Sequence, residues 1–176
     1  MTLELDNVPF WNQLDDTHTA DHRAPEDPAN DCGEECACIV MYHVTGVERA
    51  ADDVHDEILG EGVTNQWTTS YQLAAYLTRW ASIPCAVHTG LSPVEVQRTV
   101  KSSIDDKRLC IVLTRFNVND PASGHWVVAC GYDDAQNAMI AADPWGGRRR
   151  LIPWQSAWFK GDVVEVRRRR CLDVVA

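Results

Sequence analysis

The stretch of sequence that decides the fold is SGHWVVACGY at residues 123–132, followed by DDAQN at 133–137 and AMIAADP at 138–144. The two outer segments are short, apolar and rich in strand-forming residues, and the polar segment between them is typical of a turn. The sequence therefore predicts a β-hairpin whose turn is centred near residue 135. Residues whose numbers sum to about 270 should then face each other across the two strands.

His125 and Asp143 lie close to this register, at the open end of the predicted hairpin. We therefore expect their side chains to lie nearly side by side. Taken alone, a histidine at a strand end and an aspartate before a proline each have ordinary structural explanations. Together, an imidazole and an adjacent carboxylate form the pair that activates a nucleophile, because the carboxylate orients the base.

The rest of the chain has helical patterns first and strand patterns later. Helices are expected over residues 32–44, closed by Gly46, over about 68–80, and from Ser92-Pro93 through 104, where Ser suits the N-cap and Pro the first helical position. Further strands are expected at 109–116 and 163–166. Because helices and strands do not alternate, the pattern predicts an α+β fold with a mostly antiparallel sheet.

The sequence Asn30-Asp31-Cys32-Gly33 stands at the predicted start of the first helix. A cysteine there lies at the positive end of the helix dipole, near unpaired backbone amides, and both effects lower a thiol pKa. A cysteine before a helix is often merely structural. Cys36, one helical turn later, is the alternative nucleophile, but its place inside the helix favours a core position.

Length and charge narrow the class of protein. The 176 residues and 19.7 kDa fit a single domain over 1–176, and the net charge of −10 disfavours nucleic-acid binding. The Arg148-Arg149-Arg150 run and the Arg167–Arg170 run fit solvated edge strands.

Because no apolar stretch is long enough for a membrane span and the N-terminus lacks a signal-peptide pattern, we expect a cytoplasmic protein without membrane contact. Arg outnumbers Lys 13 to 3, which weakly favours a bacterial or phage source.

Seven cysteines are an odd number for a disulfide framework, and most of them lie in apolar runs typical of a core. A zinc site built from His18, His22 and the cysteines at 32, 36 and 38 is disfavoured, because the spacing provides no compact pairs of ligands. We therefore expect no metal and no cofactor.

Four motifs in order carry a resemblance to a known family: VPFWNQ at 8–13, NDCG at 30–33, GHW at 124–126 and Asp143-Pro144. Over about residues 8–154 the chain resembles the C39-like branch of the papain-like cysteine peptidases. The resemblance implies a papain-like fold, with an N-terminal helical part packed on an antiparallel sheet. It also implies that Cys32 is the nucleophile, that His125 is the general base and acid, and that Asp143 orients the imidazole.

By the same resemblance, Gln13 would donate its amide to the oxyanion hole, together with the backbone N–H of Cys32. Gly33, Gly124, Trp126 and Trp145 are candidates for the substrate cleft. The other tryptophans, at 67, 80, 154 and 158, are expected to pack in the interior. The implied partner is a peptide or protein substrate, whose identity and the oligomeric state are left open.

The chain departs from the family pattern directly after Cys32-Gly33, where Glu34-Glu35 replace a proline and a small residue. Negative charge near a thiolate raises the thiol pKa. Two other functions therefore stay open: a papain-like binding module with weakened chemistry, and a transferase that passes the acyl group to an amine. If the peptidase interpretation holds, the Cys32 pKa should lie well below about 8.5 and its sulfur within about 4 Å of a His125 ring nitrogen.

Overall fold

In the computed structural model, which describes residues 1–14 and 29–167, the hairpin predicted at 123–144 is present. Its strands are β4 (His125–Asp133) and β5 (Ala138–Asp143). They pair in antiparallel fashion with Val128 opposite Ala142, which confirms the predicted register near His125. A bulge between Ala129 and Gly131 shifts the register by one residue closer to the turn.

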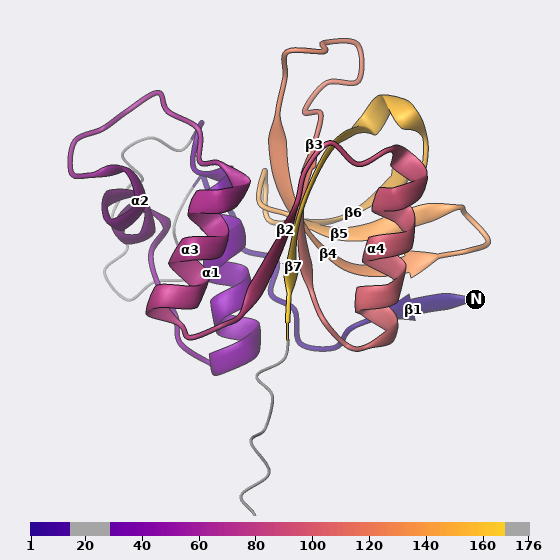
Figure 1. Cartoon of the computed structure of the whole chain (residues 1–176), viewed down its shortest axis with the longest axis horizontal. Helices are drawn as coiled ribbons and strands as arrows, with labels where there is room; N and C mark the ends of the chain where they lie inside the picture. The colour runs from indigo at the N-terminus through magenta and orange to yellow at the C-terminus, as the bar shows by residue number, and fades with distance from the viewer. Residues whose placement is uncertain (15–28, 168–176) are drawn as a thin grey trace, which may run out of the picture.

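One antiparallel sheet of seven strands surrounds this hairpin, with the order β2-β7-β3-β4-β5-β6 and with β1 paired to β4 beside that path (Figure 1). The remaining strands are β1 (Thr2–Glu4), β2 (Cys85–His88), β3 (Cys110–Thr114), β6 (Arg148–Pro153) and β7 (Phe159–Val166). The run Arg148-Arg149-Arg150 lies on β6 at the edge of the sheet, as expected, whereas most of the second arginine run lies outside the described residues.

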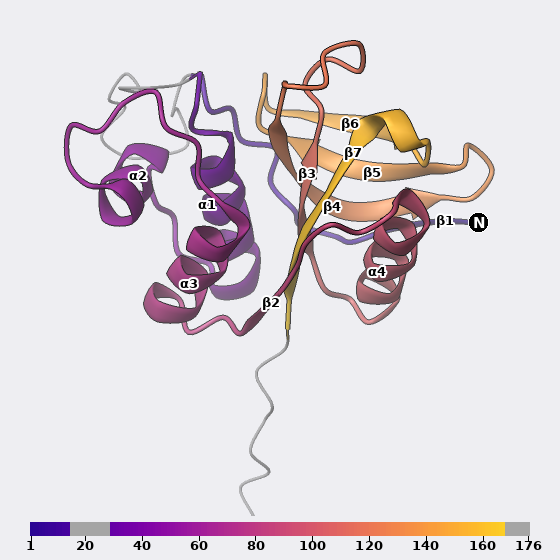
Figure 2. The same ribbon diagram turned by 45° about the horizontal axis from the view of Figure 1, so that its top comes forward.

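Helices cover both faces of the sheet (Figures 1 and 2). α1 (Cys32–Thr45), α2 (Ala51–Leu59) and α3 (Ser70–Trp80) gather on one side, and α4 (Pro93–Asp105) packs on the other. The alternation of side chains along β4 explains this arrangement. Trp126, Val128 and Cys130 face the core beneath α1 and α3, while Val127 and Ala129 face the core beneath α4. Because both faces are covered, β4 is buried along its whole length.

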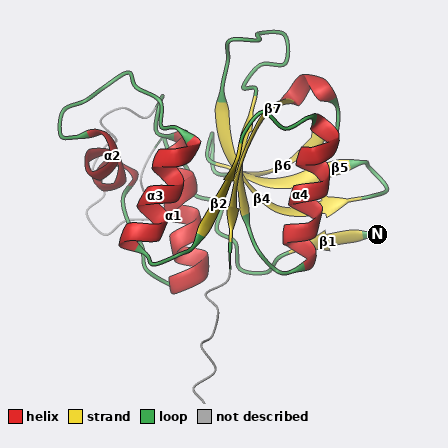
Figure 3. Cartoon of the chain, viewed as in Figure 1, coloured by secondary structure: helices red, strands yellow, loops and turns green. Residues whose placement is uncertain are grey.

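The predicted helices are confirmed to within a few residues, and their ends have the expected causes. Gly46 closes α1 in the left-handed conformation, with φ of 73°. Ser92 caps α4 in a reciprocal capping box, and Pro93 occupies its first turn. Helix α2 and the strands β1 and β2 were not predicted, and β6 was expected only as an edge strand around its arginines. Figure 3 shows the resulting mixture of helix and strand, an α+β fold as predicted.

The segment at residues 10–14 crosses to the turn that follows β5. The backbone N–H of Gln13 donates to the Pro144 carbonyl at 3.0 Å, and the Asn12 side chain accepts from the Gly146 N–H at 3.0 Å. The approach is so close that a Cβ on Gly147 would lie 2.8 Å from the Phe10 carbonyl oxygen. The N-terminal segment is therefore fixed beside the end of the sheet that carries Asp143.

Within the described part of the chain, no helix combines the length and the apolar character needed to cross a bilayer.

Candidate active site

His125 and Asp143 form a buried pair at the open end of the β4–β5 hairpin. The His125 Nε2 lies 2.6 Å from Asp143 Oδ1, and both side chains are almost fully excluded from solvent. Because a carboxylate can only accept, Nε2 carries a proton, and in the neutral imidazole the lone pair that a base needs is then on Nδ1. The sequence-predicted proximity of these two residues is therefore present in the structure.

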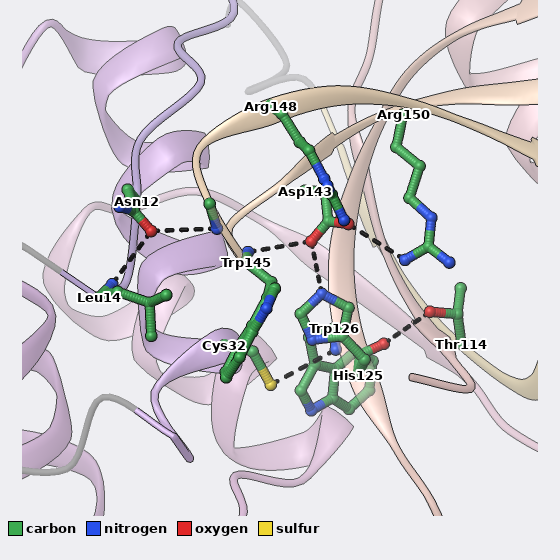
Figure 4. Close-up of polar contacts among 11 residues, drawn as sticks. Asn12, Leu14, Cys32, Thr114, His125, Trp126, Asp143, Trp145, Arg148 and Arg150 are labelled. Atoms are coloured by element: carbon green, nitrogen blue, oxygen red, sulfur yellow. Dashed lines mark hydrogen bonds and ion pairs between the residues drawn. The ribbon is translucent and has the colours of Figure 1, made fainter. Parts of the chain in front are cut away.

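Further donors hold the Asp143 carboxylate in place (Figure 4). Its Oδ1 also accepts from the Trp145 N–H at 3.0 Å, and its Oδ2 accepts from Arg150 at 3.1 Å. Burial opposes ionisation of Asp143, but the hydrogen bond and charge of His125, helped by the Trp145 amide and Arg150, outweigh it and lower the pKa of this carboxyl. Asp143 is thus an anion that can orient and stabilise a protonated imidazole.

Two aromatic rings shield this pair. The Phe116 ring meets the His125 imidazole edge-on at 5.5 Å and the Trp145 ring edge-on at 4.9 Å. On the neighbouring strand β3, the Thr114 hydroxyl donates to the His125 carbonyl at 3.0 Å, which fixes the backbone of the base. These contacts limit the movement of the imidazole and exclude water from its bond to Asp143.

Cys32 begins α1, as predicted, and its half-buried side chain lines the same cleft as His125. The Trp126 backbone N–H points at Cys32 Sγ across 3.5 Å, and Figure 4 shows the sulfur directed toward the strand that carries His125 and Trp126. The helix therefore presents the thiol to the end of β4 at which the buried pair lies.

The expectation of a low Cys32 pKa is wrong for the resting site. Burial raises the pKa of the thiol to about 12; the Trp126 N–H opposes this, while the charges of Glu34 and Asp31 add to it. Desolvation disfavours the thiolate more strongly than the helix N-terminus favours it. The resting sulfur thus carries its proton.

Gln13 is buried, with a relative exposure of 1%. Its backbone bond to the Pro144 carbonyl places it beside the turn that follows Asp143. Its proposed part in an oxyanion hole stays a prediction, as does that of the Cys32 N–H.

The four cleft candidates separate into two pairs. Gly124 and Trp145 line the cleft with Cys32 and His125. Gly33 and Trp126 instead are buried behind the thiol: a Cβ on Gly33 would lie 3.1 Å from Trp126 Cδ1, so glycine allows the helix and the indole to touch. The Trp126 Nε1–H donates to the Thr68 carbonyl at 2.9 Å, which fixes that indole.

Trp67 and Trp80 were expected to serve only in packing, but they are 53% and 48% exposed, and Trp67 forms one wall of the cleft. Its Nε1–H donates to Asn30, two residues before Cys32, at 2.8 Å, and its ring lies against Gly124, directly before His125. The cleft has a volume of about 440 Å³ and is lined mainly by apolar groups, including the rings of Trp67, Phe116 and Trp145. It can therefore take an apolar group next to the thiol and the imidazole.

Glu34 and Glu35 are both fully buried, although a solvated first turn would be the ordinary place for such residues. Glu34 accepts a hydrogen bond from the Thr68 hydroxyl and lies 3.9 Å from the ring of His55 on α2. His55 also contacts Asp31 at 3.0 Å. Sequence reasoning missed His55, because α2 carries no motif that connects it to Cys32.

Asp31, Glu34 and His55 are the one set of potential metal ligands among the described residues, and their donor atoms lie within 4.8 Å of one another. Both ring nitrogens of His55 already face oxygen atoms, so neither offers a metal its lone pair.

Cys36 and Cys38 are fully buried, which gives Cys36 the core position expected for it. His18, His22 and Cys171 lie outside the described residues.

Comparison with known proteins identifies the family of the chain. The model of the Peptidase_C39 like family matches residues 5–160. A crystal structure of a protein from Bacillus anthracis, assigned to the C39-like peptidases, is similar at a TM-score of 0.65 and 18% identity, over 97% of this chain and 100% of that chain.

UfSP from C. elegans is similar at a TM-score of 0.60 and 13% identity, over 96% of this chain and 34% of that chain. At these identities the two structures show the fold alone. No curated protein matches the chain. Because the family model matches residues 5–160, a range that includes the positions of all four motifs, the chain belongs to the Peptidase_C39 like family.

Proposed function

We propose that the chain is a cysteine peptidase that hydrolyses a peptide or isopeptide bond, with Cys32 as nucleophile, His125 as general base and acid, and Asp143 as the orienting carboxylate. The observation that carries the proposal is the 2.6 Å bond between His125 Nε2 and Asp143, formed on the cleft that also contains the Cys32 thiol. Fold and family support a papain-like peptidase in general.

The chemistry begins with a protonated thiol, because burial keeps the proton on Cys32. His125 Nδ1 removes this proton as the sulfur attacks the substrate carbonyl carbon, and Asp143 stabilises the imidazolium that forms. The negative charge that develops on the carbonyl oxygen would be bound by the Cys32 N–H and the Gln13 amide.

The intermediate then collapses, and the imidazolium returns its proton to the leaving amine. A thioester joins the acyl group to Cys32. Water, deprotonated by His125, attacks this thioester, and the sulfur leaves and regains its proton. Because burial disfavours the thiolate before substrate binds, His125 would supply the activation of the sulfur.

The test is covalent labelling with a peptidyl acyloxymethyl ketone, read by intact mass and by mapping the modified cysteine. Cys32 should be labelled selectively, and Cys32→Ser and His125→Ala should each abolish labelling. Cys85→Ser is the matched control, because Cys85 is also only partly buried but lies on β2, away from the cleft. Labelling at Cys32 that persists in His125→Ala would refute the assigned base.

The raised Cys32 pKa favours a second candidate, a papain-like binding domain with little turnover. Such a domain would bind peptides in the cleft, yet Cys32 would react no faster than a free thiol in a folded protein. A transferase would use the same three residues, and it is distinguished by supplying a primary amine and detecting the acylated amine among the products.

A further inference from the structure

The most unusual feature outside the proposed triad is the buried imidazole of His55 on α2. Its Nε2 lies 2.6 Å from the Val63 carbonyl oxygen, and its Nδ1 lies 3.0 Å from Asp31 Oδ1. Only 5% of the residue is exposed to solvent. Both ring nitrogens thus face oxygen atoms in a region with little water.

These contacts determine where the protons lie. A carbonyl oxygen can only accept, so His55 Nε2 carries a hydrogen. A second proton must lie between Nδ1 and Asp31, because two lone pairs would otherwise face each other. Burial opposes a charged ring, but the Val63 carbonyl and the carboxylates of Asp31 and Glu34 outweigh it, so the pKa of His55 is raised above 6.5.

The carboxylates beside His55 are also the ones beside the proposed nucleophile. Asp31 immediately precedes Cys32, and Glu34 follows two residues later on the same helical turn. Both charges oppose the formation of negative charge on Cys32 Sγ. Without a positive charge close by, a buried pair of carboxylates would strongly disfavour a thiolate at this position.

We propose that His55 is a positioning residue of the site, an internal cation that offsets Asp31 and Glu34 and so allows negative charge to develop on Cys32. This inference rests on the proposed function only in the assignment of Cys32 as the nucleophile. The effect of His55 on the acidity of the Cys32 thiol is measurable without a substrate.

The inference predicts a dependence on pH with a definite sign. Among the described residues, the charged groups that face His55 are Asp31, from the loop before α1, and Glu34, from α1 itself, while Val63 contributes only its carbonyl. Loss of the His55 proton therefore removes one positive charge from beside Asp31 and Glu34. The thiol should then become harder to ionise.

The experiment measures the second-order rate of Cys32 alkylation by iodoacetamide from pH 5 to 10, with the modified residue mapped by mass spectrometry. His55→Gln should move the rate profile to higher pH and slow the reaction about tenfold at neutral pH, the effect of one unit in the thiol pKa. Glu34→Gln in the native background should move the profile the opposite way, and in the His55→Gln background it should restore part of the lost rate.

His88→Gln is the matched control, because His88 also pairs with a carboxylate, Glu165, at 3.1 Å but lies on β2 and does not line the cleft. Its profile should be that of the native protein. Identical rate profiles for the native protein and for folded His55→Gln would overturn the inference. An unchanged rate profile for Glu34→Gln would also overturn it, and this second test remains available if His55→Gln fails to fold. Failure of the proposed function has a different signature: His125→Ala would leave the alkylation rate unchanged.

Discussion

Replacing Gly124 by alanine should displace Trp67 and thereby open one wall of the cleft. Gly124 has no positive φ, so the backbone itself accepts alanine. The added Cβ would overlap the Trp67 ring, with Cζ3 as the nearest atom and Cε3 at 3.1 Å. Since Trp67 is half exposed, its ring can yield by swinging toward solvent rather than by distorting the core.

The cost follows from what Trp67 would lose. Its hydrogen bond to Asn30 contributes about 0.5–1.5 kcal/mol, and removing a half-buried ring from its contacts costs about 1 kcal/mol more. We therefore expect Gly124→Ala to lower the free energy of unfolding by about 2 kcal/mol. In a Trp67→Ala background the new methyl group meets no ring, so the same substitution should be neutral or should stabilise by up to about 1 kcal/mol through the unfolded state.

The assay is a double-mutant cycle by urea unfolding, followed by far-UV circular dichroism on the native protein, the two single variants and the double variant. A coupling energy of about 2 kcal/mol is expected, because both substitutions act on one contact. Additivity within about 0.5 kcal/mol would refute the reasoning, since it would mean that Trp67 does not rest on Gly124.

Asp143→Asn should keep the fold but slow His125-dependent labelling of Cys32 at least tenfold, since the imidazolium loses its anionic partner. An unchanged labelling rate would reduce Asp143 to a turn residue. Because the pKa of His55 is raised on folding, the stability it contributes is complete below about pH 6.5 and is lost as the pH rises through its folded pKa. The difference in unfolding free energy between the native protein and His55→Gln should accordingly shrink with rising pH in urea titrations, and a difference that grew would contradict the assignment of the proton. Gly33→Ala should cost about 1–3 kcal/mol in the same assay, because its Cβ would press on Trp126. A loss below about 0.5 kcal/mol would show that α1 can move away from that indole.

The sequence predicted the parts of the fold whose signals are local. The register of the β4–β5 hairpin follows from the length of its turn, and the start of α4 follows from Ser92 and Pro93. The bounds and partner of strand β6 could not be predicted, because Arg148-Arg149-Arg150 has no apolar alternation and is held by pairing with β5. The short strands β1 and β2 likewise depend on their partners rather than on their own residues.

The candidate site likewise contains features with a local sequence signal and features that depend on distant parts of the chain. The proximity of His125 and Asp143 could be predicted because one hairpin carries both. The environment of Cys32 could not, since its pKa depends on burial and on side chains that the chain folding brings to it. His55 reaches Asp31 through the packing of α2, and Trp67 reaches Gly124 across 57 residues of chain, and neither contact leaves a pattern in the sequence.

The hydrogen bond from the Gln13 backbone N–H to the Pro144 carbonyl joins positions 131 residues apart. The Trp126 backbone N–H meets Cys32 Sγ across 94 residues. Contacts of such long sequence separation close late, because the entropy of loop closure is lost before the contacts stabilise the structure. A chain that is still being synthesised can form α1, yet it holds neither the base nor the orienting carboxylate until β4 and β5 have emerged. Under the proposed function, the order of synthesis itself therefore delays peptidase activity until the sheet is complete.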